Sequence, residues 1–242
     1  MKKQLIAITL ILGISTSFIS CSAVSDTLKK VSETVKTETP KQGETTKPSE
    51  TPKPVATASV NVDYKTAVEE FKKEFEIEGK TPKGAVKMYF KALSKVPTDI
   101  KLAEYLLTVV MNATELYKDD ISPTGYNTGS TTQGLLKTQL LAYPNILLSY
   151  FGGTPEKEYK DGVLGDVSKI NFPPNETIVG GIKVDNTAEK EGSESGRIYV
   201  KSGGKDLPTP IYMKKNPAGL WKLSNDVSSV ATGVKKPTPT DF

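Results

Sequence analysis

The sequence predicts an α+β domain, in which an N-terminal helical layer packs on a small C-terminal antiparallel β-sheet. From about residue 61 to 151, apolar residues recur at spacings of three and four, which is the period of an α-helix. From about residue 168 to 223, short runs of β-branched and aromatic residues alternate with turn residues. The composition also changes near residue 60, where a segment rich in Thr, Ser, Pro, Lys and Glu ends.

The first 21 residues have the organisation of an export signal. Lys2 and Lys3 form a positive start, and an apolar run from Leu5 to Ile14 follows it. This order is typical of a secretory signal peptide, which we place at residues 1–20. The run is shorter than the roughly 20 apolar residues that a membrane-spanning helix needs.

Cys21 is the only cysteine of the chain and directly follows this signal. The ending resembles a bacterial lipobox, in which the cysteine receives a diacylglyceryl group. A lone cysteine in an exported protein needs an explanation, and acylation supplies one. The alternative is an ordinary signal peptide with an incidental cysteine. We predict that Cys21 anchors the protein in the bacterial cell envelope, at the outer membrane or the cell surface.

Residues 21–60 are predicted to form an acylated, disordered tether. The segment has no aromatic residue and few aliphatic ones, so it cannot bury enough apolar surface to offset its conformational entropy. A flexible chain of this length has a root-mean-square reach of roughly 35 Å, and full extension would allow roughly 130 Å. The tether therefore keeps the folded part near the membrane without fixing its orientation.

Two helices open the folded region. The first is predicted from one apolar stripe and ends at Gly79; the stripe consists of Tyr64, Val68, Phe71 and Phe75. Thr81 can cap the second helix, and Pro82 suits its first position. The second helix has its own apolar face, and Pro97 should end it; the face consists of Val86, Tyr89, Phe90 and Leu93.

The next helices are more apolar. Asp99 to Thr114 is predicted to form a third helix, buried on more than one side because it is rich in Leu and Val. Ile121 to Ser130 is predicted to be a loop, marked by Pro and Gly. A fourth helical stretch runs from about Thr132 to Tyr150, and Pro144 should kink or split it.

The second half is predicted to form short strands joined by turns. The expected strands are Ile178–Val184, Arg197–Lys201, Ile211–Lys215 and Leu220–Leu223. Short connections favour antiparallel hairpins. Alternation leaves two interpretations of which face is buried, and we take as inward-facing Ile198, Val200, Ile211, Met213, Trp221 and Leu223. Residues 61–237 should form one domain and residues 238–242 a tail.

Composition excludes several kinds of chemistry. The chain has no histidine, and Cys21 is its only cysteine. Ser-His-Asp and Cys-His catalysis and His/Cys zinc sites are therefore excluded, and we expect no metal and no cofactor. The basic residues are lysines except for Arg197. Because bidentate phosphate recognition favours arginine, we expect no nucleic-acid partner. The formal charge of +4 becomes 4 − 2 = +2 once Lys2 and Lys3 are removed with the signal.

Three segments resemble functional motifs only in part. Lys201–Lys205 partly matches the phosphate-loop motif, but Asp206 stands where that motif needs Ser or Thr. We therefore interpret Lys201–Lys205 as a turn. Gly192–Gly196 has Glu194 where a nucleophile elbow needs Ser. Asp119 and Asp120 are not followed by the alternating oxygen ligands of a calcium loop. We therefore predict no catalytic residues.

Most of the folded region resembles an uncharacterised bacterial domain family of exported or lipid-anchored proteins. The resemblance begins at the run Thr81–Val86 and also touches Pro144–Pro155. It is strongest in the run Ile198–Gly204, the residues Asp206, Pro208, Pro210 and Ile211, and the run Gly219–Lys222. The family pattern often has Arg between the two prolines, where this chain has Thr209. A looser likeness is to NTF2-like lipoproteins, which implies a pocket between helices and a curved sheet.

Seven aromatic residues are candidates to line such a pocket, or else to fill the core: Tyr89, Phe90, Tyr150, Phe151, Tyr199, Tyr212 and Trp221. Our leading hypothesis is a lipid-anchored binding or interaction protein of the cell envelope without catalytic activity. Its partners would be the membrane, through the lipid, and an unidentified protein or small molecule. The alternatives are a small-ligand carrier with an NTF2-like pocket and a carboxylate-dependent hydrolase, which would need two convergent acids with shifted pKa values.

Overall fold

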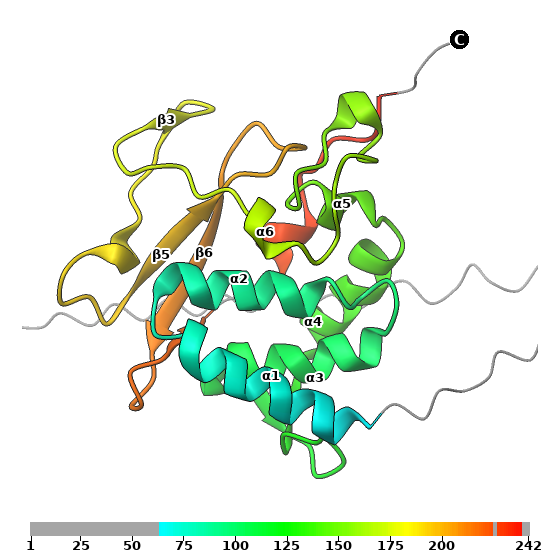
Figure 1. Ribbon diagram of the computed structural model, residues 1–242, viewed down its shortest axis with the longest axis vertical. Helices are drawn as coiled ribbons and strands as arrows, with labels where there is room; N and C mark the ends of the chain where they lie inside the picture. Colours follow the sequence, from blue (N-terminus) through cyan, green and yellow to red (C-terminus); the bar gives the residue numbers. More distant parts are fainter. Residues whose placement is uncertain (1–62, 225–226, 239–242) are drawn as a thin grey trace, which may run out of the picture. The chain divides into compact units, whose positions relative to one another are not determined.

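The computed structural model (Figure 1) describes residues 63–224 and 227–238. The predicted signal peptide, Cys21 and the predicted tether lie outside the described residues. Across the described part of the chain, no helix is both long enough and apolar enough to cross a membrane. The architecture is α+β, with helices and small antiparallel sheets, which confirms the predicted fold class.

Three helices form the first layer: α1 (Tyr64–Glu78), α2 (Pro82–Leu93) and α3 (Ile100–Val110). Each begins at a capping side chain that satisfies a free backbone N–H. The Thr81 hydroxyl accepts from the Gly84 N–H at 3.0 Å, and the Asp99 carboxylate accepts from the Leu102 N–H at 2.9 Å. The predicted first and second helices are confirmed, except that α2 ends at Leu93, before the predicted stop at Pro97.

The third helix is shorter than predicted, because its end is used for sheet pairing. Met111 is extended and pairs in parallel with Leu223, and the Asn112 N–H donates to the Leu223 carbonyl at 2.6 Å. A short 3-10 helix, Ala113–Glu115, follows. The predicted loop at residues 121–130 was also wrong in part, since it contains β2 (Tyr126–Thr128), which pairs antiparallel with β1 (Leu116–Lys118).

The fourth helical stretch is split at Pro144, as predicted. It comprises α4 (Ser130–Leu135), a π-helix (Leu136–Leu141) and α5 (Asn145–Leu148). Because proline has no N–H, the helix can restart at Asn145 but cannot run through Pro144.

The second half contains two antiparallel sheets. A small hairpin pairs β3 (Ile178–Val179) with β4 (Ile182–Lys183). The larger sheet has the order β5 (Ser195–Val200), β6 (Thr209–Lys215) and β7 (Trp221–Leu223). All six side chains predicted to face inward on this sheet are at most 3% exposed. A short helix, α6 (Ser228–Ala231), was not predicted and packs against α5 and β6.

Both edges of the larger sheet are covered, which prevents it from pairing with other chains. Along β5, the Tyr199 N–H donates to the Asn186 side-chain oxygen at 2.8 Å, and the Arg197 N–H donates to the Thr187 hydroxyl at 3.0 Å. Along β7, the Trp221 N–H donates to the Gly79 carbonyl at 2.8 Å, in addition to the pairing with Met111. The sheet is therefore closed by local loops and by the helical layer.

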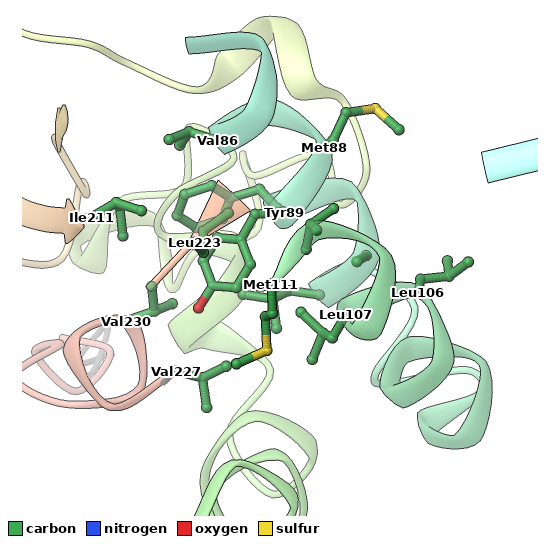
Figure 2. Close-up of a cluster of buried hydrophobic side chains, with 14 of the residues drawn as sticks. Val86, Met88, Tyr89, Leu106, Leu107, Met111, Ile211, Leu223, Val227 and Val230 are labelled. Carbon is green, nitrogen blue, oxygen red and sulfur yellow. The ribbon is translucent and has the colours of Figure 1, made fainter. Parts of the chain in front are cut away.

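The core lies where the helical layer meets the larger sheet and α6. Figure 2 labels ten side chains of this core, in or next to α2, α3, β6, β7 and α6, of which Met88 and Leu106 point away from the centre of the group: Val86, Met88, Tyr89, Leu106, Leu107, Met111, Ile211, Leu223, Val227 and Val230. Each of these side chains is buried. The helices predicted from apolar stripes and the strands predicted from alternating apolar residues thus share one core.

Candidate functional site

The structure brings four of the seven candidate aromatics into one group, which we call the aromatic cluster: Tyr89, Phe90, Tyr150 and Phe151. Phe90 lies at its centre, with ring centroids 5.4 Å from Tyr89, 4.9 Å from Tyr150 and 6.2 Å from Phe151. All four side chains are at most 1% exposed. The cluster joins α2 to the segment that follows α5, and contacts of this geometry stabilise a core.

The other three candidates lie elsewhere. Trp221 is buried on β7, with the Lys215 ammonium 5.2 Å from its ring. Tyr199 is buried on β5, whereas Tyr212 on β6 is 45% exposed. Strand alternation puts Tyr199 and Tyr212 on the face opposite the inward-facing residues. The seven residues therefore do not surround one site, and their role as pocket lining stays a prediction for the four clustered ones.

The aromatic cluster borders a group of polar side chains, which we call the polar corner: Tyr150, Thr209 and Lys205. The Tyr150 and Thr209 hydroxyls are 2.7 Å apart. The Lys205 ammonium donates to the Thr209 hydroxyl at 3.3 Å and to the Ser229 carbonyl at 2.6 Å. Desolvation lowers the pKa of Lys205 to about 8 and raises the pKa of Tyr150. This corner ties the loop before β6 to α6.

The polar corner contains a hydroxyl beside a lysine of lowered pKa, which is a combination that can activate a nucleophile. Thr209 is only 2% exposed, however, so its hydroxyl is enclosed by the fold. The lysine is also engaged by a backbone carbonyl. This arrangement favours a structural role, in which the ammonium bonds the Ser229 carbonyl and gives the Thr209 hydroxyl a second partner beside Tyr150.

A second half-buried lysine, Lys222 on β7, caps a helix. Its ammonium donates to the Val109 carbonyl in the last turn of α3 and lies 4.2 Å from the centre of the Phe75 ring. Desolvation, with Lys72 nearby, lowers its pKa to about 8. A cation is favourable at a helix C-terminus and over an aromatic face. The lysine of the Gly-Leu-Trp-Lys stretch therefore joins β7 to two helices.

The Ser202-Gly203-Gly204 segment is a structural connection, in keeping with its interpretation as a turn. A Cβ at Gly203 would lie 2.2 Å from the Gly153 carbonyl oxygen, and one at Gly204 would lie 2.6 Å from the Tyr159 hydroxyl. The Ser202 hydroxyl donates to the Ser149 hydroxyl at 2.7 Å. These glycines are needed for close approach of two chain segments.

Three of the described carboxylates have shifted pKa values, and each has a structural partner. Asp63, Asp161 and Asp166 have lowered pKa values because neighbouring hydroxyls and backbone N–H groups donate to them. For Asp161 the largest cause is the Thr154 N–H, at 3.0 Å. Within the described residues, no group of three or more acidic or cysteine side chains is placed to hold a metal.

The outer face of the larger sheet presents an aromatic and a cationic side chain together. Arg197, the only arginine of the chain, pairs in register with Tyr212 across β5 and β6. Its guanidinium lies 5.4 Å from the Tyr199 ring and contacts Asp185, whose carboxylate is 4.0 Å away. We call Arg197, Tyr212 and Lys214 the outer sheet face. Sequence reasoning singled out Arg197 by its rarity, but only the strand register places it beside Tyr212.

Comparison with known proteins identifies the family. The family described as a domain of unknown function, DUF6935, matches residues 64–238, which is most of the chain and nearly all of the described residues. No curated protein and no solved structure shows significant similarity to the chain. The expected resemblance to an uncharacterised domain family is confirmed, while the looser likeness to NTF2-like lipoproteins stays a prediction. The chain therefore belongs to the family of this domain of unknown function, DUF6935.

Proposed function

We propose that the protein is a lipid-anchored binding protein of the bacterial cell envelope, which engages a partner without catalysing a reaction. The observation that carries this proposal is the position of Cys21, the only cysteine, directly after a positive start and an apolar run. The Thr- and Pro-rich segment that follows suits a tether that lets the folded domain search a volume close to the membrane.

Supporting this non-catalytic role, the unusual titratable groups already have structural partners. Lys205 and Lys222 each donate to a backbone carbonyl, and Tyr150 is bonded to Thr209. Groups used in this way hold the fold together and leave no free acid or base at the polar corner. This structural use of the titratable groups supports a role in recognition.

The outer sheet face is the best candidate surface for recognising a partner of the envelope. Tyr212 is 45% exposed, and exposed tyrosine and arginine are the residues that most often anchor interfaces. Arg197 is held by Asp185 and by the Tyr199 ring, so it is already oriented before a partner arrives. Lys214 adds a second cation next to them.

The test is in-cell cross-linking of the full chain, followed by recovery of cross-linked partners. Tyr212→Ala should remove the partner that the parent recovers, by a loss of about tenfold or more if Tyr212 is an anchor. Tyr143→Ala is the matched control, since it removes another surface tyrosine, 55% exposed and just before α5. A partner recovered equally by the Tyr212→Ala variant would show that another surface binds it.

A small-ligand carrier is the second candidate, favoured by the aromatic cluster and its polar corner. Thermal unfolding with the apolar dye 1-anilinonaphthalene-8-sulfonate would test it. A carrier should be stabilised by the dye, and Phe90→Leu should reduce that stabilisation. An unchanged melting temperature would leave the cluster as core only.

A further inference from the structure

The segment after α6 lies against two loops, and we call residues 232–238 the strap. It forms neither a helix nor a strand. Lys236 and Thr238 each precede a proline, which restricts them to an extended backbone. Figure 1 shows the strap, in red after α6, running beside the green loop that follows α5. We call the two loops, residues 154–159 and 202–206, the strap site.

The strap site holds the backbone of the strap. The Lys235 N–H donates to the Gly204 carbonyl at 2.8 Å, and the Lys235 carbonyl accepts from the Tyr159 hydroxyl at 2.6 Å. Further along, the Thr238 N–H donates to the Pro155 carbonyl at 3.0 Å. Bonds of this kind give affinity for an extended main chain whatever its side chains are.

Two strap side chains add selectivity to these backbone bonds. Val234 packs against the core, and a Cβ at Gly204 would lie 2.7 Å from the Val234 Cγ1, so the glycine makes room for an aliphatic residue. The Lys235 ammonium lies 2.6 Å from the Asp206 carboxylate. The site therefore fits an aliphatic residue that is followed by lysine.

The strap contributes little to the core. Val234 is half-buried, and the other strap residues are exposed. In α6, by contrast, Val230 and Ala231 are at most 2% exposed. Segments with few buried contacts open locally at a small fraction of the stability of the whole fold. The strap can therefore leave its site while α6 stays in place.

Both loops of the strap site are held by bonds that do not involve the strap. The Tyr159 N–H donates to the Thr154 carbonyl at 2.8 Å, and the Thr154 N–H donates to the Asp161 carboxylate at 3.0 Å. In the other loop, the Gly203 N–H donates to the Ser149 carbonyl at 2.8 Å. The site therefore keeps its shape without the strap, and an incoming chain would not have to order it.

The loop that carries Tyr159 is strained. Glu158 and Tyr159 are consecutive residues other than glycine, with φ values of +51° and +62°. Such left-handed conformations are unfavourable for bulky side chains and gather at sites that clamp a ligand. Here the strain brings the hydroxyl of the buried Tyr159 to the Lys235 carbonyl.

The contacts at the strap site do not require that the strap belong to the same chain. A separate peptide with the same backbone and side chains can make each of them, but the connected strap has the advantage of a high effective concentration. We propose that the strap site recognises an extended partner peptide in which a β-branched aliphatic residue precedes a lysine, and that the strap occupies this site in cis. This inference rests neither on the lipid anchor nor on the outer sheet face.

The test is fluorescence anisotropy of a labelled peptide with the sequence of residues 232–238, added to the full chain. Every protein sample carries Cys21→Ser, so that neither a thiol nor a lipid contributes. In the full chain, Val234→Asp should release the strap, because it places a carboxylate at a half-buried apolar position. The released site should bind the peptide about tenfold or more tightly than the parent does.

Thr238→Asp is the matched control, because it introduces the same carboxylate at an exposed strap position and keeps the backbone bond to Pro155. This variant should bind the peptide as the parent does. A peptide that itself carries Val234→Asp should not bind the released site. A peptide that carries Lys235→Glu should bind it more weakly, since a like charge then meets Asp206.

Circular dichroism should show that the Val234→Asp chain is folded. If it is not, Val234→Thr makes the same comparison, since it keeps the shape of the side chain and buries a hydroxyl. A folded variant that binds the peptide no better than the parent would overturn the proposal. So would a dimeric parent that becomes monomeric with Val234→Asp in sedimentation, since the strap would then occupy a second copy of the chain. Tyr212→Ala should leave peptide binding unchanged, so the strap site and the outer sheet face can fail separately.

Discussion

Gly203 offers the sharpest test of how the loop before β6 is held. In Gly203→Ala, the new Cβ would lie 2.2 Å from the Gly153 carbonyl oxygen and 3.2 Å from its carbon. Both atoms belong to backbone, so neither can swing away as the end of a flexible side chain can. The two segments must move apart, although the alanine backbone conformation itself is unstrained at this position.

The cost follows from what this movement breaks. Overpacking of this kind costs about 1–3 kcal/mol. The Gly203 N–H donates to the Ser149 carbonyl at 2.8 Å, and loss of one such bond costs about 1 kcal/mol more. We therefore expect a loss of about 2–4 kcal/mol in the free energy of unfolding. For a domain of this size that corresponds to a melting temperature lower by about 5–15 °C.

Gly134→Ala is the matched control, because the same substitution should act in the opposite direction. Gly134 lies in α4, and a Cβ there would meet no atom within 4 Å. Replacing a helical glycine by alanine stabilises by about 0.5–1 kcal/mol. Thermal and urea unfolding, followed by circular dichroism, would measure both variants. An unchanged melting temperature in Gly203→Ala would refute the close approach of the two segments.

Three further predictions concern stability. The folded-state pKa values of Lys205 and Lys222 lie near 8, below the value of 10.5 in the unfolded chain, so the cost of burying each charged ammonium is present below pH 8 and is relieved as the pH rises. The urea concentration at the unfolding midpoint should therefore increase between about pH 8 and 9.5. Lys222→Met should reduce this increase. Asp99→Ala should lower the free energy of unfolding in urea by about 1 kcal/mol, since it removes the N-terminal cap of α3. A loss no larger than that of an exposed surface substitution would contradict this capping role. Asn186→Ala should lower the free energy of unfolding by about 2–4 kcal/mol, because the buried Tyr199 N–H and Pro173 carbonyl lose their partner. Hydrogen exchange at the Tyr199 amide should accelerate, and unchanged protection there would contradict the role of Asn186 in covering the edge of β5.

Local patterns predicted the parts of the fold that local physics controls. The cap at Thr81 and the stripe of α1 depend on spacing within one helix. The inward faces of β5 to β7 depend on alternation within one strand. These features could be predicted because each depends on residues that are close together in the sequence.

The features that were missed depend on partners far away in the sequence. Met111 has helix-forming neighbours, but it leaves α3 to pair with Leu223, more than a hundred residues later. Asn186 covers the edge of β5 from a separate loop. Such pairings override local preference, and nothing in the local sequence marks them.

The candidate site was predictable only as a set of residue types. Aromatic residues could be named, but their grouping depends on how α2 packs against the segment after α5. The pKa values of Lys205 and Lys222 are lowered by burial that no spacing reveals. Arg197 was noticed because it is unique, whereas its neighbour Tyr212 became meaningful through strand register.

We propose that Cys21 carries the lipid that holds this domain in the cell envelope. The most direct measurement is metabolic labelling with radioactive palmitate of cells that produce the full chain or its Cys21→Ala variant. We expect the parent to be labelled and found in the membrane fraction, and the Cys21→Ala variant to be unlabelled and either soluble or unprocessed. An unlabelled parent chain would contradict a lipid at Cys21.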